Sequence, residues 1–326
     1  MTTQPDNSFK HQSVLLAEVV ASLAVTNGQR FIDGTLGAAG HASALLTELP
    51  LCHLIGIDRD PRAIQAARQP LAPFAERAHC VQGRYSDMAT IAAELGWDSV
   101  DGVLLDIGVS SPQIDDPQRG FSFRFAGPLD MRMNPDDPVS AATILNEYSE
   151  AELADIFYHY GEERMARRVA RAVVARRADQ PWERTEDFAE LLERIIGRAH
   201  QHGLPPATRC FQALRIAVNH ELDELRDGLQ AALSLLRPGG RLAVISFHSL
   251  EDRIVKHFMR HEAATCICPP GLPICICNKK ASLAIVTKKP ITAATAELAE
   301  NPRAASAKLR VAEKITEAAV ASSTFA

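Results

Sequence analysis

Three aspartates in the first third of the chain are the residues best placed to do chemistry. Asp33 ends the apolar run FID, Asp58 ends HLIGID, and Asp106 nearly ends VDGVLLDIG. Short apolar runs of this kind are typical of buried parallel strands, whose carboxyl ends share one crevice. The three carboxylates are therefore expected to converge on a single ligand.

The loop after Asp33 limits what that ligand is. It reads G-x-x-G-x-x-G over residues 34–40, whereas dinucleotide sites read G-x-G-x-x-G. Three carboxylates would repel a pyrophosphate but attract a ligand with a sulfonium and an ammonium group. S-adenosylmethionine has both charges, and it has a ribose for Asp58, where an acid commonly binds ribose hydroxyls. The alternative is that the glycines form a structural turn and that Asp33 caps a helix or supports the loop.

A second cluster, LLDIGVSSPQ at 104–113, follows the fourth apolar run. A small, polar segment with a proline, just after an acid-ended fourth strand, is where amino-directed methyltransferases hold their target nitrogen. One such nitrogen, the exocyclic amine of cytosine, is a poor nucleophile because its lone pair is conjugated with the ring. Acceptors for its hydrogens therefore help it to attack a methyl group. Backbone carbonyls near Ser110 and Ser111 are candidates, and Pro112 stiffens the segment because its φ is fixed. Positioning supplies the rest, up to roughly 7–11 kcal/mol in well-oriented cases. The alternative is a structural turn between strand and helix, in which Ser-Pro only marks the start of the helix.

The elements that must hold these residues alternate between strands and helices. Apolar runs predict strands over 30–33, 53–58, 78–83, 100–108 and 240–248, and antiparallel last strands over 284–289 and 308–314. Helical patterns separate the first four strands at 41–49, 61–71 and 88–96. This alternation predicts an α/β fold with a doubly wound sheet.

The fifth strand arrives too late to be reached by an ordinary loop. Helical patterns fill the interval, so residues 115–205 are expected to form an inserted all-helical domain. The sheet domain then comprises 1–114 and 206–314, and 315–326 is expected to be a flexible tail. A single long helix over 210–237 is expected to lead back into the sheet.

Composition and charge exclude several classes of protein. The 326 residues carry a net charge of −5, so any nucleic-acid surface has to be local. No apolar run reaches the ~20 residues of a membrane span, and the first residues lack the apolar core of a secretory signal. The seven cysteines are an odd number, which fits a reducing compartment better than a disulfide framework. We therefore expect a cytoplasmic protein with no membrane partner.

The densest positive run is RMARRVARAVVARR, which begins at Arg164. On a helix, Arg164, Arg167, Arg168 and Arg171 would share one stripe and form an RNA-binding face. The alternative is a solvated helix face whose arginines pair with neighbouring acids.

Ten segments, spread in order along the chain, form a recognisable set of motifs. They are HQSVLL (11–16), IDGTLGAAGH (32–41), IDRDP (57–61), LLDIGVSSPQID (104–115), RGFSF (119–123), GPLDMRM (127–133), YGEER (160–164), ATRCFQALRIAVN (207–219), LRPGGRLAVISFHSLEDRIVK (236–256) and NPRAASAKLRVAE (301–313). The set resembles the bacterial small-subunit ribosomal RNA methyltransferase H family. That resemblance implies a Rossmann-like class I methyltransferase fold, S-adenosylmethionine as cofactor, and methylation of N4 of a cytosine in the decoding region.

The resemblance also implies site residues and a partner. The predicted cofactor-binding residues are Gly37, Ala39, Gly40, His41, Asp58, Tyr85, Asp106 and Gln113. The predicted catalytic residues are Asp106, Ser111, Pro112 and His248. The family usually has glycine at the position of Ala39, and alanine is tolerable there only with a negative φ. The substrate is small-subunit ribosomal RNA, either naked or in a 30S particle, and a homodimer is left open.

Several of these residues have a structural alternative. His41 either contacts the cofactor or opens a helix, and Tyr85 either lies against the adenine or packs in the core. His248 and Ser249 either lie beside the target base or orient their own loop. Three residues at helical spacing either contact phosphate or form a salt-bridged helix surface: Arg209, Gln212 and Arg215.

Four cysteines form a C-x-C…C-x-C array in CICPPGLPICIC, at Cys266, Cys268, Cys275 and Cys277. Four thiols so close together could take Zn²⁺, but the spacing differs from the common C-x₂-C pairs. The expectation is a reduced apolar hairpin and no metal.

Two other functions compete with amino-directed methylation. A cytosine-C5 methyltransferase needs a cysteine nucleophile in the crevice, and 104–113 contains none. A binding-only protein would use the insert and the cysteine array as an adaptor, and would bind the cofactor without transferring a methyl group.

Overall fold

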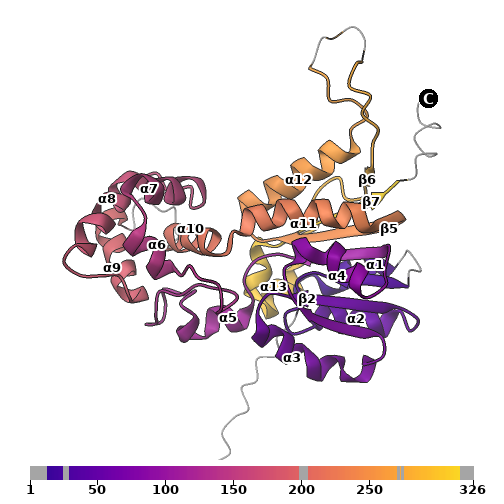
Figure 1. Cartoon of the computed structure of the whole chain (residues 1–326), viewed down its shortest axis with the longest axis horizontal. Helices are drawn as coiled ribbons and strands as arrows, with labels where there is room; N and C mark the ends of the chain where they lie inside the picture. The colour runs from indigo at the N-terminus through magenta and orange to yellow at the C-terminus, as the bar shows by residue number, and fades with distance from the viewer. Residues whose placement is uncertain (1–12, 25–28, 198–204, 270–271, 273–274, 316–326) are drawn as a thin grey trace, which may run out of the picture. The chain divides into compact units, whose positions relative to one another are not determined.

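The computed structural model describes residues 13–24, 29–197, 205–269, 272 and 275–315. The chain forms two compact units (Figure 1). Unit 1 combines Met1–Ile107 with Asp227–Ala326, and unit 2 is Gly108–Arg226. From residue 316 onward, the predicted tail lies outside the described residues.

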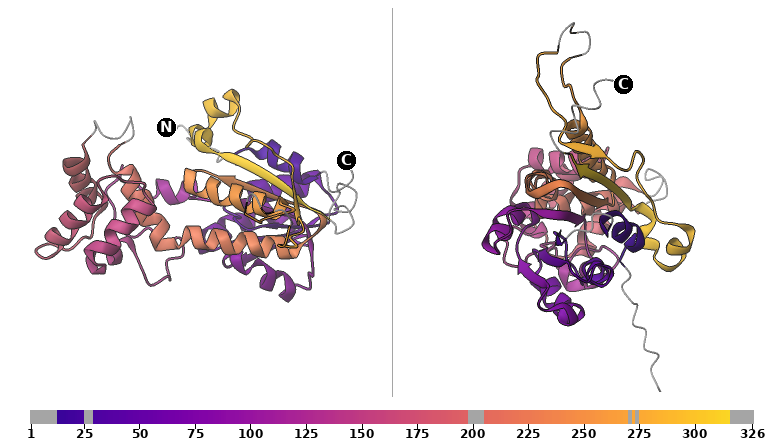
Figure 2. Two further views of the ribbon diagram at one scale, coloured as in Figure 1. Left: turned by 90° about the horizontal axis from the view of Figure 1, so that it is seen from above. Right: turned by 90° about the vertical axis from the view of Figure 1, so that its right-hand side faces the viewer.

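Unit 1 is built on a seven-stranded sheet with the order β3-β2-β1-β4-β5-β7-β6. Its strands are β1 (Arg30–Asp33), β2 (His53–Asp58), β3 (Ala78–Gln82), β4 (Val100–Asp106), β5 (Leu236–Ser246), β6 (Leu283–Ile285) and β7 (Lys308–Lys314). The first five run parallel, and β7 lies antiparallel between β5 and β6 (Figure 2). The predicted doubly wound α/β sheet is confirmed. The chain order reverses beside β1, so the carboxyl ends of β1 and β4 meet at the switch point where such sheets bind ligands.

The strands β1, β2 and β4 are buried on both faces, as their continuous apolar runs predict, whereas β3 and β6 at the two edges are more exposed. Phe31, Leu54 and Leu104 belong to a hydrophobic cluster that also takes residues from the first three helices. Ile32 and Ile55 alternate with them along the strands and are also buried. The sheet is therefore a rigid platform for the residues at its carboxyl edge.

The helices of unit 1 cover this sheet. They are α1 (Leu16–Ala24), α2 (Gly40–Glu48), α3 (Pro61–Leu71), α4 (Met88–Glu94), α12 (Ser249–Ala263) and α13 (Thr295–Glu300), together with α11 (Glu221–Leu235), which belongs to unit 1 from Asp227 onward. Helix α3 has its predicted bounds because Asp60 accepts the Arg62 N–H and Pro61 occupies the first turn. Helices α1 and α13 are not among those predicted. Within the described part of the chain, no helix is both long and apolar enough to cross a bilayer.

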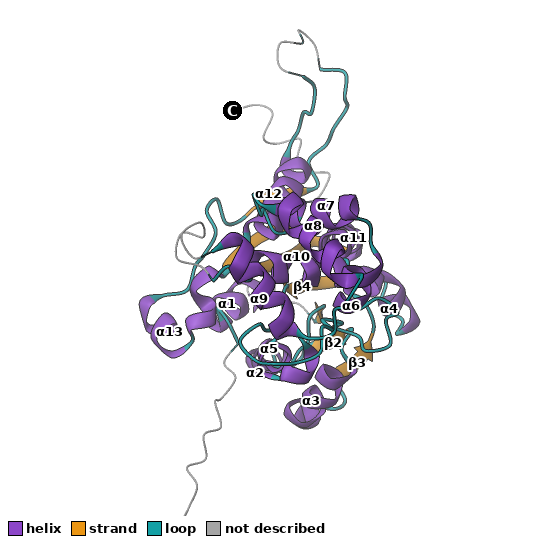
Figure 3. Ribbon diagram, turned by 90° about the vertical axis from the view of Figure 1, so that its left-hand side faces the viewer, coloured by secondary structure: helices purple, strands orange, loops and turns teal. Residues whose placement is uncertain are grey.

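Unit 2 consists of helices and loops (Figure 3). Its helices are α5 (Ser111–Asp115), α6 (Ala141–Glu147), α7 (Glu150–His159), α8 (Ala166–Arg177), α9 (Thr185–Ile196) and α10 (Thr208–Asn219). Its core centres on Phe188, whose ring lies 6.0 Å from Phe157, 5.7 Å from Trp182 and 5.6 Å from Phe211. Because α10 supplies Phe211 and Leu214 to this core, the compact unit is wider than the expected insert at 115–205.

The single helix predicted over 210–237 is wrong. His220 adopts the left-handed conformation, with φ 50° and ψ 36°, and ends α10 before α11 begins. Strand β5 also begins earlier than predicted, since Leu236 already pairs with Val100. The register shifts before Gly102 pairs with Arg241, so residues 237–240, which lie between the two paired positions, form a bulge within the strand.

Candidate functional site

Asp33 and Asp106 end neighbouring strands and are connected through Thr35. The Thr35 N–H donates to Asp33 Oδ1 at 3.1 Å, and the Asp106 N–H donates to Thr35 Oγ1 at 2.6 Å. The Gly34 N–H donates to the Leu104 carbonyl at 2.9 Å. These hydrogen bonds fasten the loop after β1 to the end of β4, so the two carboxyl groups lie at the same edge of the sheet.

Asp58 supports the glycine loop from the end of β2. Its Oδ2 accepts the Gly37 N–H at 2.9 Å, and its Oδ1 accepts the Asp60 N–H at 2.9 Å. Gly37 has a φ of 51°, which favours glycine at this turn. Each carboxylate oxygen has a second lone pair, so Asp58 can hold the loop and still accept hydrogen bonds from ribose hydroxyls.

Ala39 lies in the left-handed region, with φ 63° and ψ 27°, and is fully buried. The condition set for alanine at this position, a negative φ, is therefore not met. The Ala39 N–H donates to the Leu36 carbonyl at 2.8 Å, and the Ala39 carbonyl accepts the Ser43 N–H at 2.9 Å. The turn from loop to α2 imposes this conformation, which costs an alanine roughly 1–2 kcal/mol. At Gly40, a Cβ would collide with the Ser13 side chain, so the loop packs tightly against the chain before α1.

His41 follows in the first turn of α2 and is buried. Its Nε2 lies 2.9 Å from the Val14 carbonyl, and its Nδ1 lies 3.8 Å from Asp106 Oδ2. The side chain thus connects the segment before α1 with the acid at the end of β4.

Burial raises the pKa of all three carboxyl groups. The pKa of Asp33 rises to about 7, chiefly through burial, with a further increase from the charge of Asp58. Burial raises the pKa of Asp58 to about 6. The pKa of Asp106 rises to about 8 through burial and the charges of Asp33 and Glu251. The cluster therefore resists holding three negative charges without a compensating cation.

The carboxyl groups of this cluster fit a cationic ligand. Asp106 Oδ1 is buried and has no hydrogen-bond partner among the residues that the structure describes. A buried acceptor without a donor is destabilising unless a ligand supplies one. A ligand with a sulfonium and an ammonium would compensate the acids and lower their pKa values. The residues present therefore fit S-adenosylmethionine.

Tyr85 lies beside the same loop, at the start of a 3₁₀ turn (Tyr85–Asp87) after β3. A Cβ on Gly34 would lie 2.9 Å from Tyr85 Cβ, and a Cβ on Gly228 of α11 would collide with the Tyr85 ring. One side of the ring is therefore held by the glycine face of α11, which sets the orientation of the aromatic plane.

His248 and Glu251 form the start of α12. Glu251 Oε2 accepts the Phe247 and His248 N–H groups at 2.8 and 3.2 Å, and His248 Nε2 lies 3.0 Å from Glu251 Oε1. Glu251 is buried, and its charge contributes to the raised pKa of Asp106. His248 thus caps a helix in this structure, and the base contact predicted for it stays a prediction.

The predicted segment after β4 begins unit 2. Ser111 and Pro112 occupy the first turn of α5, and Gln113 Oε1 accepts the Ser110 N–H at 3.0 Å. The Ser110 carbonyl accepts the N–H groups of Gln113 and Ile114, each at 3.2 Å. Both lone pairs of that carbonyl are thus used within α5. The prediction that a backbone carbonyl near Ser110 and Ser111 accepts cytosine hydrogens therefore stays a prediction, and it now falls on the neighbouring carbonyls of the segment.

Comparisons with known proteins show the family of this chain. Residues 8–315 match the MraW methylase family. The chain belongs to the MraW methylase family. It is 51% identical over 310 residues to the ribosomal RNA small subunit methyltransferase H of Heliobacterium mobile, which covers 94% of this chain and 99% of that protein. The protein of the same name from Geobacter sulfurreducens is 53% identical over 94% of this chain and its own full length.

Solved structures show a more remote likeness. An rRNA methylase from Streptococcus thermophilus has a TM-score of 0.41 and 9% identity, over 97% of this chain and 99% of that chain. At that score the likeness has no weight for function. Membership of the MraW methylase family makes this chain a methyltransferase, and its cofactor is S-adenosylmethionine.

The arginine-rich run of this methylase divides into two groups. Arg167, Arg168 and Arg171 are exposed on α8, whereas Arg164 lies in the turn before the helix and not on it as predicted. The last two arginines are structural. Arg176 lies 4.0 Å over the Trp182 ring and pairs with Asp187 at 3.1 Å, and Arg177 donates to two carbonyls near α6.

The second set of basic residues is held by its own neighbours. Arg215 makes two hydrogen bonds to Glu221, at 2.8 and 2.9 Å. Arg209 donates to the Glu162 carbonyl at 3.1 Å, and Gln212 donates to the Tyr160 carbonyl at 3.1 Å. These contacts agree with the salt-bridged alternative for α10.

Two residues of the site were missed in the sequence analysis. Thr35 connects Asp33 to Asp106 through hydrogen bonds. Glu251 accepts the His248 N–H, and its charge raises the pKa of Asp106. The signal for Thr35 is its place two residues after Asp33, because an aspartate side chain commonly accepts the backbone N–H two residues further on. The signal for Glu251 is its place three residues after His248, as in a capping box.

Proposed function

We propose that this MraW-family methylase transfers a methyl group from S-adenosylmethionine to N4 of a cytosine in the decoding region of small-subunit ribosomal RNA. The observation that supports the RNA substrate is sequence identity of 51–53% to proteins named ribosomal RNA small subunit methyltransferase H, over 94% of this chain. The amino-directed chemistry is supported by the acid that ends β4 and the Ser-Ser-Pro segment that follows it.

The acids have distinct proposed roles. When bound, S-adenosylmethionine supplies a methyl group on a positively charged sulfur. Asp58 holds the glycine loop and binds ribose hydroxyls, and Asp33 supplies a buried negative charge. Asp106 Oδ1 is a buried acceptor with no hydrogen-bond partner among the described residues. It accepts a hydrogen bond from the ligand or from the cytosine amine. Ser111 and Pro112 then orient the base, and His248 orients the segment after β5.

Direct transfer without a covalent protein–RNA intermediate is supported by where the cysteines lie. Cys52 and Cys210 are fully buried, and Cys80 lies in the middle of β3. The four remaining cysteines follow the far end of α12, whose 15 residues span about 22 Å from His248. A C5 mechanism would need a thiolate against the base.

Unit 2 is the proposed substrate-recognition domain. Its helix α8 presents Arg167, Arg168 and Arg171 to solvent, and Tyr158 on the neighbouring α7 is 59% exposed. Guanidinium groups bind phosphates, and exposed aromatic rings stack on unpaired bases. Exposed arginines beside an exposed aromatic ring therefore suit the binding of an RNA loop.

Mass spectrometry of ribosomal RNA nucleosides from cells with and without the gene tests the proposal. We expect loss of N4-methylcytidine from the small-subunit RNA, restored by the wild-type gene but not by one encoding Asp106→Ala. Loss of 5-methylcytidine instead, or a denaturation-stable adduct with 5-fluorocytosine RNA, would contradict direct N4 transfer. An unchanged nucleoside profile would favour the binding-only alternative.

A further inference from the structure

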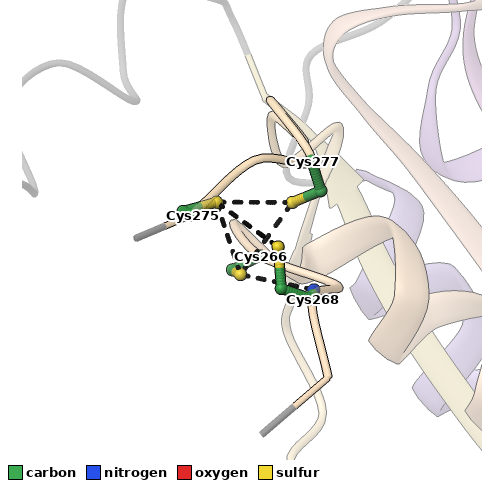
Figure 4. Close-up of side chains that lie close together, drawn as sticks. All are labelled: Cys266, Cys268, Cys275 and Cys277. Atoms are coloured by element: carbon green, nitrogen blue, oxygen red, sulfur yellow. Dashed lines mark hydrogen bonds between the residues drawn. The ribbon is translucent and has the colours of Figure 1, made fainter. Parts of the chain in front are cut away.

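Four cysteine thiols gather on the hairpin that follows α12, away from the carboxyl edge of the sheet. Cys266 and Cys268 lie on the outgoing limb, and Cys275 and Cys277 lie on the returning limb (Figure 4). The four Sγ atoms all lie within 4.8 Å of one another. We propose that this cysteine tetrad binds one structural Zn²⁺ ion.

The distances between the sulfurs fit one tetrahedral ion. The Sγ of Cys275 lies 3.5 Å from that of Cys266 and 3.5 Å from that of Cys277. The Cys268–Cys275 and Cys266–Cys277 distances are both 3.9 Å. Zinc–sulfur bonds of about 2.3 Å place tetrahedral ligand sulfurs about 3.8 Å apart. Thiolates around an iron–sulfur cluster enclose a core of several atoms and are spaced further apart.

The backbone of the hairpin supports the same assignment. The Cys268 N–H donates to Cys266 Sγ at 3.4 Å, and the Ile267 N–H donates to Cys277 Sγ at 3.4 Å. Hydrogen bonds to ligand atoms orient them and stabilise their charge at metal sites. Asn278, directly after the last cysteine, has a φ of 49°, a conformation that asparagine tolerates better than most residues.

The described residues of the hairpin form no apolar core of their own. Between Thr265 and Asn278, no described residue is buried, and Ile267 and Ile276 are 51% and 72% exposed. Four neutral thiols make only weak hydrogen bonds with one another. A metal ion supplies the missing cross-link between the two limbs, as in small zinc-dependent folds.

The base of the hairpin is attached to α12 through Glu262. Lys279 Nζ lies 3.0 Å from Glu262 Oε2, and the Ser282 N–H donates to the Glu262 carbonyl at 2.8 Å. Lys279 and Lys280 also place two positive charges next to a site whose four thiolates and zinc carry a net charge of −2. Because four protein ligands leave no open position, the site is structural and not catalytic.

The test uses untagged full-length protein, purified with a reductant and without chelators, and measures metal by elemental mass spectrometry. We expect about one zinc per chain, and loss of zinc in Cys266→Ser and in Cys277→Ser. Cys80→Ser is the control, because Cys80 is a free, half-buried cysteine of β3 that lies outside the tetrad, and it should retain zinc. Cobalt offered to the stripped protein should give the intense d–d absorption of a tetrahedral tetrathiolate site.

Folding and metal loss are separated by two further measurements. Cofactor affinity should be the same in the wild type and in Cys277→Ser, because the tetrad lies about a helix length from His248. Trypsin should cleave the stripped protein at Lys279 or Lys280 faster than the zinc-loaded protein. The proposal is overturned if zinc-supplemented protein retains four free thiols without metal, if the tetrad forms disulfides or binds iron, or if zinc persists in the tetrad variants.

Discussion

His41 Nδ1 points at Asp106 from 3.8 Å, while His41 Nε2 contacts the Val14 carbonyl at 2.9 Å. A carbonyl oxygen only accepts hydrogen bonds, so Nε2 has the proton, and in neutral His41 the Nδ1 atom is an acceptor. Asp106, whose pKa rises to about 8, therefore faces this acceptor as a neutral acid near pH 7. A bound cation would convert Asp106 to the carboxylate, which couples protonation of the site to cofactor binding.

Cofactor affinity should accordingly rise with pH between about 6 and 8 and then level off. The pKa values of Asp58, Asp33 and Asp106 are about 6, 7 and 8 in the empty protein. A cation lowers all three, so binding releases protons and is favoured as pH rises. Calorimetry in two buffers with different ionisation enthalpies measures the released protons directly. A flat affinity over this range, or proton uptake, would show that the acids do not sense the cofactor.

Asp106→Asn should stabilise the empty protein at pH 8 while weakening the cofactor. A carboxyl whose folded pKa exceeds its unfolded value of 3.8 loses stability as pH rises from about 4 to about 8. Removing the charge should recover on the order of 1–3 kcal/mol at pH 8 and little at pH 4. Chemical denaturation at both pH values measures this difference. Asp101→Asn is the control with the opposite expected effect. Asp101 accepts the Gln29 and Arg30 N–H groups, so this substitution should lower the free energy of unfolding.

Ala39→Gly should increase the free energy of unfolding by about 1 kcal/mol, because glycine adopts φ 63° without the steric penalty of alanine. The cofactor affinity should stay within about a factor of two, since the loop conformation is unchanged. Ala38→Gly is the matched control, because Ala38 has no positive φ and should be neutral or slightly destabilising. Equal effects from the two substitutions would mean that φ at position 39 is not the cause.

Asp58→Ala should weaken cofactor binding by about 1.5–3 kcal/mol, as expected for a lost hydrogen bond to a charged group. Asp58→Asn is the sharper variant. Both carboxylate oxygens accept N–H groups, from Gly37 and Asp60, and an amide NH₂ would face one of these donors. Unfolding curves of the empty protein separate a disturbed loop from a lost ribose contact. Unchanged affinity in both variants would contradict the proposed role of Asp58.

Gly228→Ala should destabilise unit 1 although alanine is the better helix former by about 1 kcal/mol. A Cβ at this position collides with the Tyr85 ring, so the ring must leave its place. The second substitution in Gly228→Ala/Tyr85→Ala should relieve the collision and restore part of the lost stability. Cofactor affinity should fall in both variants if the adenine lies against Tyr85. A stabilised Gly228→Ala protein would show that the ring moves freely.

A triple variant should weaken RNA binding and leave cofactor affinity unchanged if it replaces Arg167, Arg168 and Arg171 with Gln. Each lost phosphate contact should reduce the slope of log affinity against log salt by somewhat under one unit. Arg62→Gln/Arg68→Gln, on exposed positions of α3, is the charge control for a matching Arg167→Gln/Arg168→Gln variant. If both double variants lower RNA affinity equally, the effect is one of general charge and α8 is not the RNA face.

The sheet and the position of its acids follow from the sequence alone. Continuous apolar runs specify strands buried on both faces, and an acid at the end of each run must then lie at the carboxyl edge. β1, β2 and α3 have their predicted bounds for this reason, and Asp60 and Pro61 mark the start of α3 in the sequence itself. Local patterns suffice wherever neighbouring residues determine the conformation.

Tertiary structure decided what depends on residues far apart in the chain. Ala39 adopts a positive φ because the loop must meet both β4 and α2, and the Ser110 carbonyl is occupied because α5 forms directly after it. The helical pattern continues through His220, yet this residue adopts the left-handed conformation and ends the helix there. The C-x-C spacing alone predicted no metal, and only the pairing of the two hairpin limbs brings four sulfurs to tetrahedral distances. Spacing in sequence constrains neighbours, whereas a site is defined by distances that the fold alone sets.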